Sequence, residues 1–287
     1  MTSTEFQPRS ALSGIPVLGV GLGFRPPFYR NLLRNEDAVD FLEITADHYF
    51  DAPLEKEKEL DQLQERFTLI PHGLSLSLGS AEGIDHEYVD KLAAQVERVD
   101  PPYWSEHIAF TGAGGVDIGH LAPLPFSRES IDVVCRNIRE VRRSIDRPLI
   151  LENISYVVNL PGAEMKEGEF IREILESTDC GLLLDVTNLY INSLNLGYDA
   201  IAVLDELPME RVVQLHFVGG HWHDGVLIDS HSRATPQEIF DLMDAVVERS
   251  PLKGIILERD DNIPPFAELA RELETARDIG RKHSRWD

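Results

Sequence analysis

Histidines and carboxylates that could bind metal ions follow short apolar runs at several places in this sequence. His72, Glu152 and Asp185 each stand at the end of such a run, although they lie far apart in the chain. In a parallel barrel the C-terminal ends of all strands meet at one mouth, so residues that are distant in sequence become neighbours there. Imidazole and carboxylate groups without thiolates suit iron, manganese or zinc and argue against copper(I). The pattern therefore predicts a metalloenzyme.

Nine residues at predicted strand ends, or in the segments that follow them, are candidate metal ligands. They are His72, His107, Glu152, Asp185, Asn188, His216, Asp229, His231 and Glu258. Glu152, Asp185 and Glu258 would be costly to bury and would repel one another unless a cation bound them, and we assign them as the catalytic carboxylates. One zinc ion takes at most four protein ligands, so the size of the set predicts two or three ions. For any one of these carboxylates a helix cap or an arginine partner is an alternative, and Asn188 could be a turn residue.

Eight apolar runs rich in Val, Ile, Leu and Phe predict the strands that position these residues. The runs are Val17–Leu22, Val39–Ile44, Phe67–Ile70, Tyr103–Phe110, Pro148–Leu151, Gly181–Asp185, Val212–Val218 and Gly254–Leu257. Segments with helical period follow most of them, at 54–63, 88–99, 131–145, 170–175, 201–207, 239–246 and 266–273. The alternation predicts an α/β fold, a single TIM barrel of eight strands and helices over 14–287, after a flexible N-terminus, 1–13. A doubly wound sheet is the alternative, but Gly19–Gly23 lacks the spacing of a dinucleotide site.

The composition narrows the possible partners. The 287 residues include 27 Lys and Arg against 50 Asp and Glu, a formal net charge of −23, which opposes binding to nucleic acid. The polar N-terminus has no basic segment followed by an apolar core, and no apolar run approaches the roughly 18 residues of a membrane span. Cys135 and Cys180 fall within apolar patterns, so we expect buried thiols and no disulfide scaffold. These features predict a cytoplasmic protein that binds neither nucleic acid nor membranes.

A series of ordered motifs resembles those of the multinuclear non-haem iron-dependent oxidases, a family that includes the iron subunit of methanobactin synthase. The resemblance runs from about Gly19 to Pro264. Its motifs are His72-Gly73-Leu74-Ser75-Leu76, Ser105-Glu106-His107, Leu151-Glu152-Asn153, Leu184-Asp185-Val186-Thr187-Asn188, His216-Phe217-Val218-Gly219-Gly220-His221, Asp229-Ser230-His231 and Glu258-Arg259-Asp260. The number of motifs and their order make the resemblance specific.

The resemblance implies a xylose-isomerase-like barrel that holds two or three iron ions, Fe2+ or Fe3+, and uses O2 as a co-substrate. The family's ligands correspond to the nine candidate residues, with Asn188 among them. The implied activity is the oxidative modification of a ribosomally made precursor peptide, often at cysteine. A small partner protein that binds the leader peptide is also implied.

Four further residues near the predicted mouth are candidate substrate contacts: Asp47, His48, Asn153 and His221. The pair Asp47-His48 stands where many family members carry Glu-Asn, and Phe28 stands near a position where many carry histidine. These departures flank the mouth, so the substrate and the outcome of the reaction can differ from those of other members.

Two other functions fit part of the pattern. Sugar isomerases and abasic-site endonucleases with related barrels also bind Zn or Mn through His, Glu and Asp at strand ends. Strand-end lysines that could serve an isomerase are missing here, and the charge of −23 opposes the approach of DNA. A metal-binding module without catalysis is the third possibility, which so many candidate ligands at an open mouth disfavour.

Overall fold

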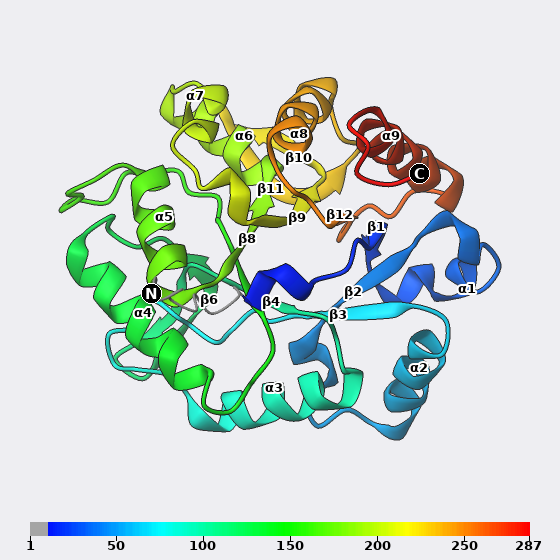
Figure 1. Ribbon diagram of the computed structural model, residues 1–287, viewed down its shortest axis with the longest axis horizontal. Helices are drawn as coiled ribbons and strands as arrows, with labels where there is room; N and C mark the ends of the chain where they lie inside the picture. Colours follow the sequence, from blue (N-terminus) through cyan, green and yellow to red (C-terminus); the bar gives the residue numbers. More distant parts are fainter. Residues whose placement is uncertain (1–10) are drawn as a thin grey trace, which may run out of the picture.

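Eight parallel strands form a closed barrel in the computed structural model, which describes residues 11–287 (Figure 1). In chain order they are β1 (Gly19–Gly23), β2 (Phe41–Thr45), β3 (Thr68–His72), β4 (Trp104–His107), β7 (Leu149–Glu152), β8 (Gly181–Asp185), β9 (Val212–Phe217) and β12 (Gly254–Leu257). Each strand pairs with the next barrel strand along the chain, and β1 pairs with β12 to close the ring. All eight overlap the predicted runs, so the TIM-barrel prediction is confirmed.

Helices surround the barrel and cover the outer faces of its strands (Figure 1). The described α-helices are α1 (Tyr29–Leu32), α2 (Leu54–Gln64), α3 (His86–Val99), α4 (Arg128–Val141), α5 (Glu167–Thr178), α6 (Val186–Leu196), α7 (Ala200–Leu204), α8 (Gln237–Arg249) and α9 (Phe266–Lys282). Short 3-10 helices are η1 (Ala11–Gly14), η2 (Pro26–Phe28), η3 (Glu36–Ala38), η4 (Ala46–Tyr49) and η5 (Met209–Arg211). The sequence did not predict α6, because seven of its residues, polar ones included, are buried and no polar face marks a helical period.

The predicted flexible N-terminus, 1–13, lies mostly outside the described residues. Its last three residues belong to η1. Among the helix starts, Asp85 caps α3 by accepting hydrogen bonds from the backbone of Glu87 and Tyr88, and Ser127 caps α4. Within residues 11–287, no helix is both long enough and apolar enough to cross a membrane.

The alternation of side chains along each strand decides what enters the barrel. In β7, Ile150 belongs to an apolar cluster inside the barrel, Leu151 packs outward against the helices, and Glu152 points inward again. The same two-residue step leads from Leu183 to Asp185 on β8. The inner cluster, which we call the floor, consists of Ile15, Phe41, Ile70, Tyr103, Ile150, Leu183, Val213 and Ile256. On β2, β3, β4, β7, β8 and β12 the residue two positions after the floor residue is polar, and these residues form a layer at the C-terminal mouth.

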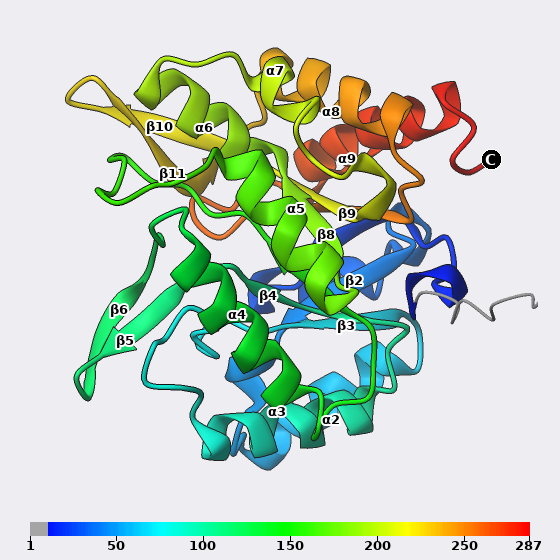
Figure 2. The same cartoon turned by 60° about the vertical axis from the view of Figure 1, so that its left-hand side comes forward.

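Two hairpins extend from the mouth and were not predicted. They are β5 (Phe110–Ala113) with β6 (Val116–Ala122), and β10 (Gly219–His223) with β11 (Val226–Arg233). Figure 2 shows both hairpins projecting from the same end of the barrel. The predicted strand Tyr103–Phe110 is therefore too long, because Phe110 already belongs to the first hairpin. The segment 229–231, predicted as a loop, lies within β11, in the irregular stretch where the register between β10 and β11 shifts.

Candidate metal centre

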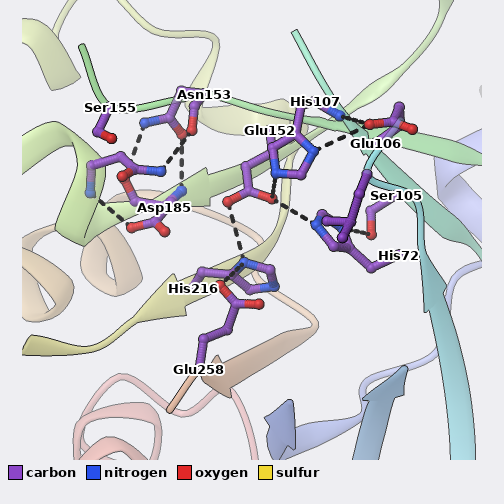
Figure 3. Close-up of polar contacts among 12 residues, drawn as sticks. His72, Ser105, Glu106, His107, Glu152, Asn153, Ser155, Asp185, His216 and Glu258 are labelled. Carbon is purple, nitrogen blue, oxygen red and sulfur yellow. Dashed lines mark hydrogen bonds and ion pairs between the residues drawn. The ribbon is translucent and has the colours of Figure 1, made fainter. Parts of the chain in front are cut away.

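Six of the predicted ligands lie above the floor in two groups that share Glu152 (Figure 3). The first group is His72, His107 and Glu152, and the second is Glu152, Asp185, His216 and Glu258. Glu152 Oε2 lies 3.5 Å from His72 Nε2 and 3.4 Å from His107 Nε2. Its other oxygen, Oε1, lies 3.3 Å from His216 Nδ1. One carboxylate facing two sets of ligands can bridge two neighbouring metal ions.

Four of these ligand candidates carry a buried oxygen without a hydrogen-bond partner. The atoms are Glu152 Oε2, Asp185 Oδ2, Asn188 Oδ1 and Asp229 Oδ1, of which Glu152 Oε2 and Asp229 Oδ1 face histidine nitrogens as ion pairs. A buried polar atom without a partner costs about 1–3 kcal/mol, and more when it is charged. All four are oxygen acceptors of the kind that divalent and trivalent cations bind. The donor set and its unpartnered oxygens therefore fit bound metal ions.

His231 and Asp229 reach the mouth from the hairpin rather than from a barrel strand. His231 Nε2 lies 2.9 Å from Asp229 Oδ1, and its Nδ1 lies 3.8 Å from Glu258 Oε2 and 3.0 Å from Asp260 Oδ2. The backbone of His231 has a φ of 49°, a left-handed conformation that is uncommon for a residue with a side chain. Such strain gathers at functional sites. This pair lies beside the second group and could complete a further site there.

Asp185 and Asn188 are joined by the start of α6. Asp185 Oδ1 accepts a hydrogen bond of 2.9 Å from the backbone N–H of Asn188, which makes Asp185 the helix cap. The Asn188 side chain donates to the backbone carbonyl of Asn153 at 3.1 Å. The cap leaves Asp185 Oδ2 and Asn188 Oδ1 without hydrogen-bond partners. The structural and the ligand roles of these residues are therefore compatible.

Neighbouring side chains orient the first two histidines. Ser105 Oγ lies 2.8 Å from His72 Nδ1, and Glu106 Oε1 lies 3.1 Å from His107 Nδ1. Each ring consequently turns Nε2 toward Glu152. Hydrogen bonding of the outer nitrogen is how proteins hold metal-binding histidines. A Cβ atom on Gly73 would lie 2.6 Å from Glu106 Oε2, so the glycine makes room for this carboxylate.

A buried chain of polar groups orients the third histidine. The Tyr103 hydroxyl donates to Gln214 Oε1 at 2.6 Å, and Gln214 Nε2 donates to Glu43 Oε2 at 2.7 Å. Glu43 Oε2 lies 3.0 Å from His216 Nε2, which leaves Nδ1 for the centre. Sequence reasoning assigned no role to Glu43 or Glu106. The signal for Glu43 was present, because it lies in an apolar run like the other carboxylates.

The charges of the centre are strongly coupled. Burial opposes the protonation of His216, but Glu258 and Glu43 raise its pKa well above the ordinary value. Burial would raise the pKa of Glu258, yet His216 holds that pKa well below its usual range. Burial and the charge of Glu152 raise the pKa of Asp185 well above the usual range. Protons on histidines thus neutralise part of the carboxylate charge, and a metal ion that binds here must displace them.

The four predicted substrate contacts are not gathered in one place. Asn153 is buried, and its side-chain amide makes two hydrogen bonds to the backbone of Asp185. Asn153 Oδ1 accepts from Asp185 N at 2.9 Å, and Asn153 Nδ2 donates to Asp185 O at 3.1 Å. Asp47 accepts from the Tyr88 hydroxyl at 3.0 Å. His48 is exposed on η4, and His221 is half-buried on β10. Asn153 therefore supports the centre, whereas the other three remain candidates for substrate contact.

Comparison with known proteins identifies the family. The model of a family described as RiPP precursor modification enzyme MbnB/TglH/ChrH matches residues 19–281. The chain belongs to this family. RiPP denotes a ribosomally synthesised and post-translationally modified peptide, and the match confirms the family that the motifs predicted.

Relatives in this family cover the chain almost completely. A UPF0276 protein of Rhizorhabdus wittichii is 38% identical over 276 residues, which is 96% of this chain and 99% of the relative. A UPF0276 protein of Caulobacter vibrioides is 37% identical over 263 residues, 91% of this chain and 94% of the relative. A relative from Streptomyces avermitilis is longer, since the match of 38% identity covers 93% of this chain but 56% of that protein.

Solved structures with a similar fold support a xylose-isomerase-like barrel. A xylose isomerase domain protein from Planctomyces limnophilus matches with a TM-score of 0.58 at 13% identity, covering 94% of this chain and all of that one. D-psicose 3-epimerase from Clostridium cellulolyticum H10 matches with a TM-score of 0.56 at 12% identity, covering 92% of this chain and 98% of that one. At these identities the likeness concerns the fold alone, which is the predicted xylose-isomerase-like barrel.

Proposed function

We propose that this protein is an iron-dependent oxidase that uses O2 to modify a ribosomally synthesised precursor peptide. The observation that carries the proposal is the pair of ligand groups sharing Glu152, in a chain of a RiPP precursor modification family. Nitrogen and oxygen ligands without thiolate suit iron. Bound iron would supply the activation of O2, and two or three ions would use the nine candidate ligands.

The chain's own residues have three roles in this proposal. Glu152 holds the two groups together, and Asp185 and Glu258 complete the second group. Glu43, Ser105 and Glu106 fix the histidine rings, as their hydrogen bonds indicate. The projecting hairpins and the rim residues Asp47, His48 and His221 would contact the peptide and exclude water from the reacting side chain. In this proposal the modified residue of the peptide is a cysteine.

The proposal includes a partner and a location. A small protein would bind the leader of the precursor and deliver its core to the mouth, and the modification would take place in the cytoplasm. The formal charge of −23 favours a basic peptide segment and disfavours nucleic acid as a partner. Coexpression of the chain and a candidate precursor, with and without a candidate leader-binding protein, tests this part.

The test of the function is the mass of a candidate peptide after reaction. A candidate precursor, sought among short peptides encoded beside this gene, is incubated with iron-loaded protein, in air and under anaerobic conditions. We expect a mass change only with iron and O2, and its loss in His107→Ala, which removes a ligand candidate. A mass change that proceeds equally without O2, or with zinc in place of iron, would contradict the oxidase and favour a zinc or manganese hydrolase or isomerase.

A further inference from the structure

A cavity of about 390 Å³ lies outside the barrel, beside the segment that follows β7. This segment, the N-terminal turn of α5, helix α7 and residues 123–126 before α4 line it. Apolar side chains form most of its wall, among them Leu124, Phe126, Val158, Met165 and Val203. The volume lies in the range of about 300–1,000 Å³ that is typical of ligand sites. None of the residues assigned to the metal centre lines it.

Glu167 is a carboxylate of this wall without a cation, whereas Asp199, which also lines the cavity, is exposed and caps α7. Glu167 Oε2 accepts a hydrogen bond of 2.9 Å from the Tyr156 hydroxyl. Lys166, the neighbouring cation, is paired with Glu206 instead. Among the described residues no Lys, Arg or His forms an ion pair with Glu167. Burial raises the pKa of Glu167 to about 7, against the opposing effect of the Tyr156 hydrogen bond.

The cavity is tied to the metal centre through the chain itself. Tyr156, which lines the cavity, comes four residues after Glu152, so the two lie at most roughly 14 Å apart. The segment between them is fixed, because Asn192 accepts from Tyr156 N at 2.8 Å and Ser155 Oγ donates to Asp229 Oδ2 at 3.2 Å. A smaller cavity lined by residues 153, 154, 156 and 167 lies at the same junction.

We propose that the larger cavity binds a basic side chain, Lys or Arg, of the peptide substrate, within about five residues of the modified position. The inference rests on the proposed peptide substrate. The alkyl stem of such a side chain would pack on the apolar wall while its cationic head reached Glu167. The rings of Phe126 and Tyr156 favour a cation at the same place. The acidic charge of the whole chain, −23, also favours a basic segment.

The test uses a small probe, Nα-acetyl-lysine methylamide, and needs no precursor and no activity. Its binding is measured by saturation-transfer NMR against the matched norleucine compound, which lacks the ammonium group. Glu167→Gln removes the charged hydrogen bond to the ammonium group of the probe. We expect this variant to bind the lysine probe at least about tenfold more weakly than the wild type does. Glu169→Gln is the control, because Glu169 is exposed on the same helix and carries the same charge.

A second variant keeps the test independent of Glu167. Ala202 lines the cavity from the exposed side of α7, so Ala202→Trp should block the cavity and abolish binding of the lysine probe. Equal binding of both probes to the wild-type protein would overturn the proposal, as would undiminished binding to Glu167→Gln or no saturable binding at all. A protein that binds the lysine probe as expected but modifies no peptide would refute the proposed function and leave the cation site standing.

Discussion

Replacement of Glu152 by glutamine should weaken both parts of the metal centre at once, because its carboxylate faces both ligand groups. Loss of an outer contact to a metal ligand typically lowers affinity by about 10–100-fold. A residue in both ligand groups should lie at the upper end of this range or above it, and we take about 100-fold for each ion. At a free metal concentration of 100 Kd, binding stabilises the native protein by about 2.7 kcal/mol per ion, against about 0.4 kcal/mol when Kd has risen 100-fold. The difference of about 2.3 kcal/mol corresponds to a fall in Tm of roughly 5–9 °C per ion.

The assay pairs metal analysis with thermal unfolding. Wild-type, Glu152→Gln and the surface control Glu169→Gln are dialysed against a competing chelator, reloaded with iron and analysed for metal content and Tm. We expect the control to match the wild type, and the metal-free forms of all three to retain the same fold by circular dichroism. A Glu152→Gln protein that retains every ion with wild-type affinity would refute the shared role of this carboxylate.

Three further changes test separate parts of the structure. Glu43→Gln removes the carboxylate that holds His216 Nε2, so iron affinity should fall about 10–100-fold in a metal titration, and an unchanged Kd would exclude this role. Asp185→Asn removes a buried carboxyl whose pKa is raised well above its usual range, so folding no longer has to protonate it, and the metal-free protein should melt at a higher temperature while metal content falls. A lower Tm without metal would contradict this electrostatic account. The pKa of Glu167 is raised to about 7 in the native protein, so wild-type stability should fall as pH rises from about 4.5 through 7, by up to about 3 kcal/mol. Glu167→Gln lacks this loss, so its free energy of unfolding relative to the wild type should rise between pH 5 and pH 8 in denaturant melts. A difference in unfolding free energy that does not change with pH would argue against the raised pKa.

The barrel was predictable because each strand is buried on both faces and therefore appears as a continuous apolar run. The same runs located the inward-pointing residues, since Glu152 and Asp185 follow floor residues by two positions. Helix α6 escaped prediction because its polar residues are buried at the mouth, where Asn188 and Asn192 bind backbone groups rather than solvent. Periodicity cannot distinguish such a helix from a loop.

The hairpins and the supporting carboxylates were harder to predict for other reasons. Most of β6 is exposed and its strand pairs locally with β5, so no buried face gives either strand a strong pattern. Glu106 points toward the backbone around Leu76, from which it accepts a hydrogen bond of 3.2 Å. That contact depends on two neighbouring strands, and a single sequence does not record it. The left-handed backbone of His231 lies where the register of the hairpin shifts, and a single sequence does not reveal such a shift.

The measurement that tests the central claim most directly is the metal content of protein purified from iron-supplemented cells, with Mössbauer or EPR spectra before and after mild reduction. The proposed centre predicts two or three iron ions per chain, magnetically coupled, and a spectrum that changes on exposure to O2. Stoichiometric zinc or manganese without iron, unchanged by reduction or by O2, would contradict the iron oxidase.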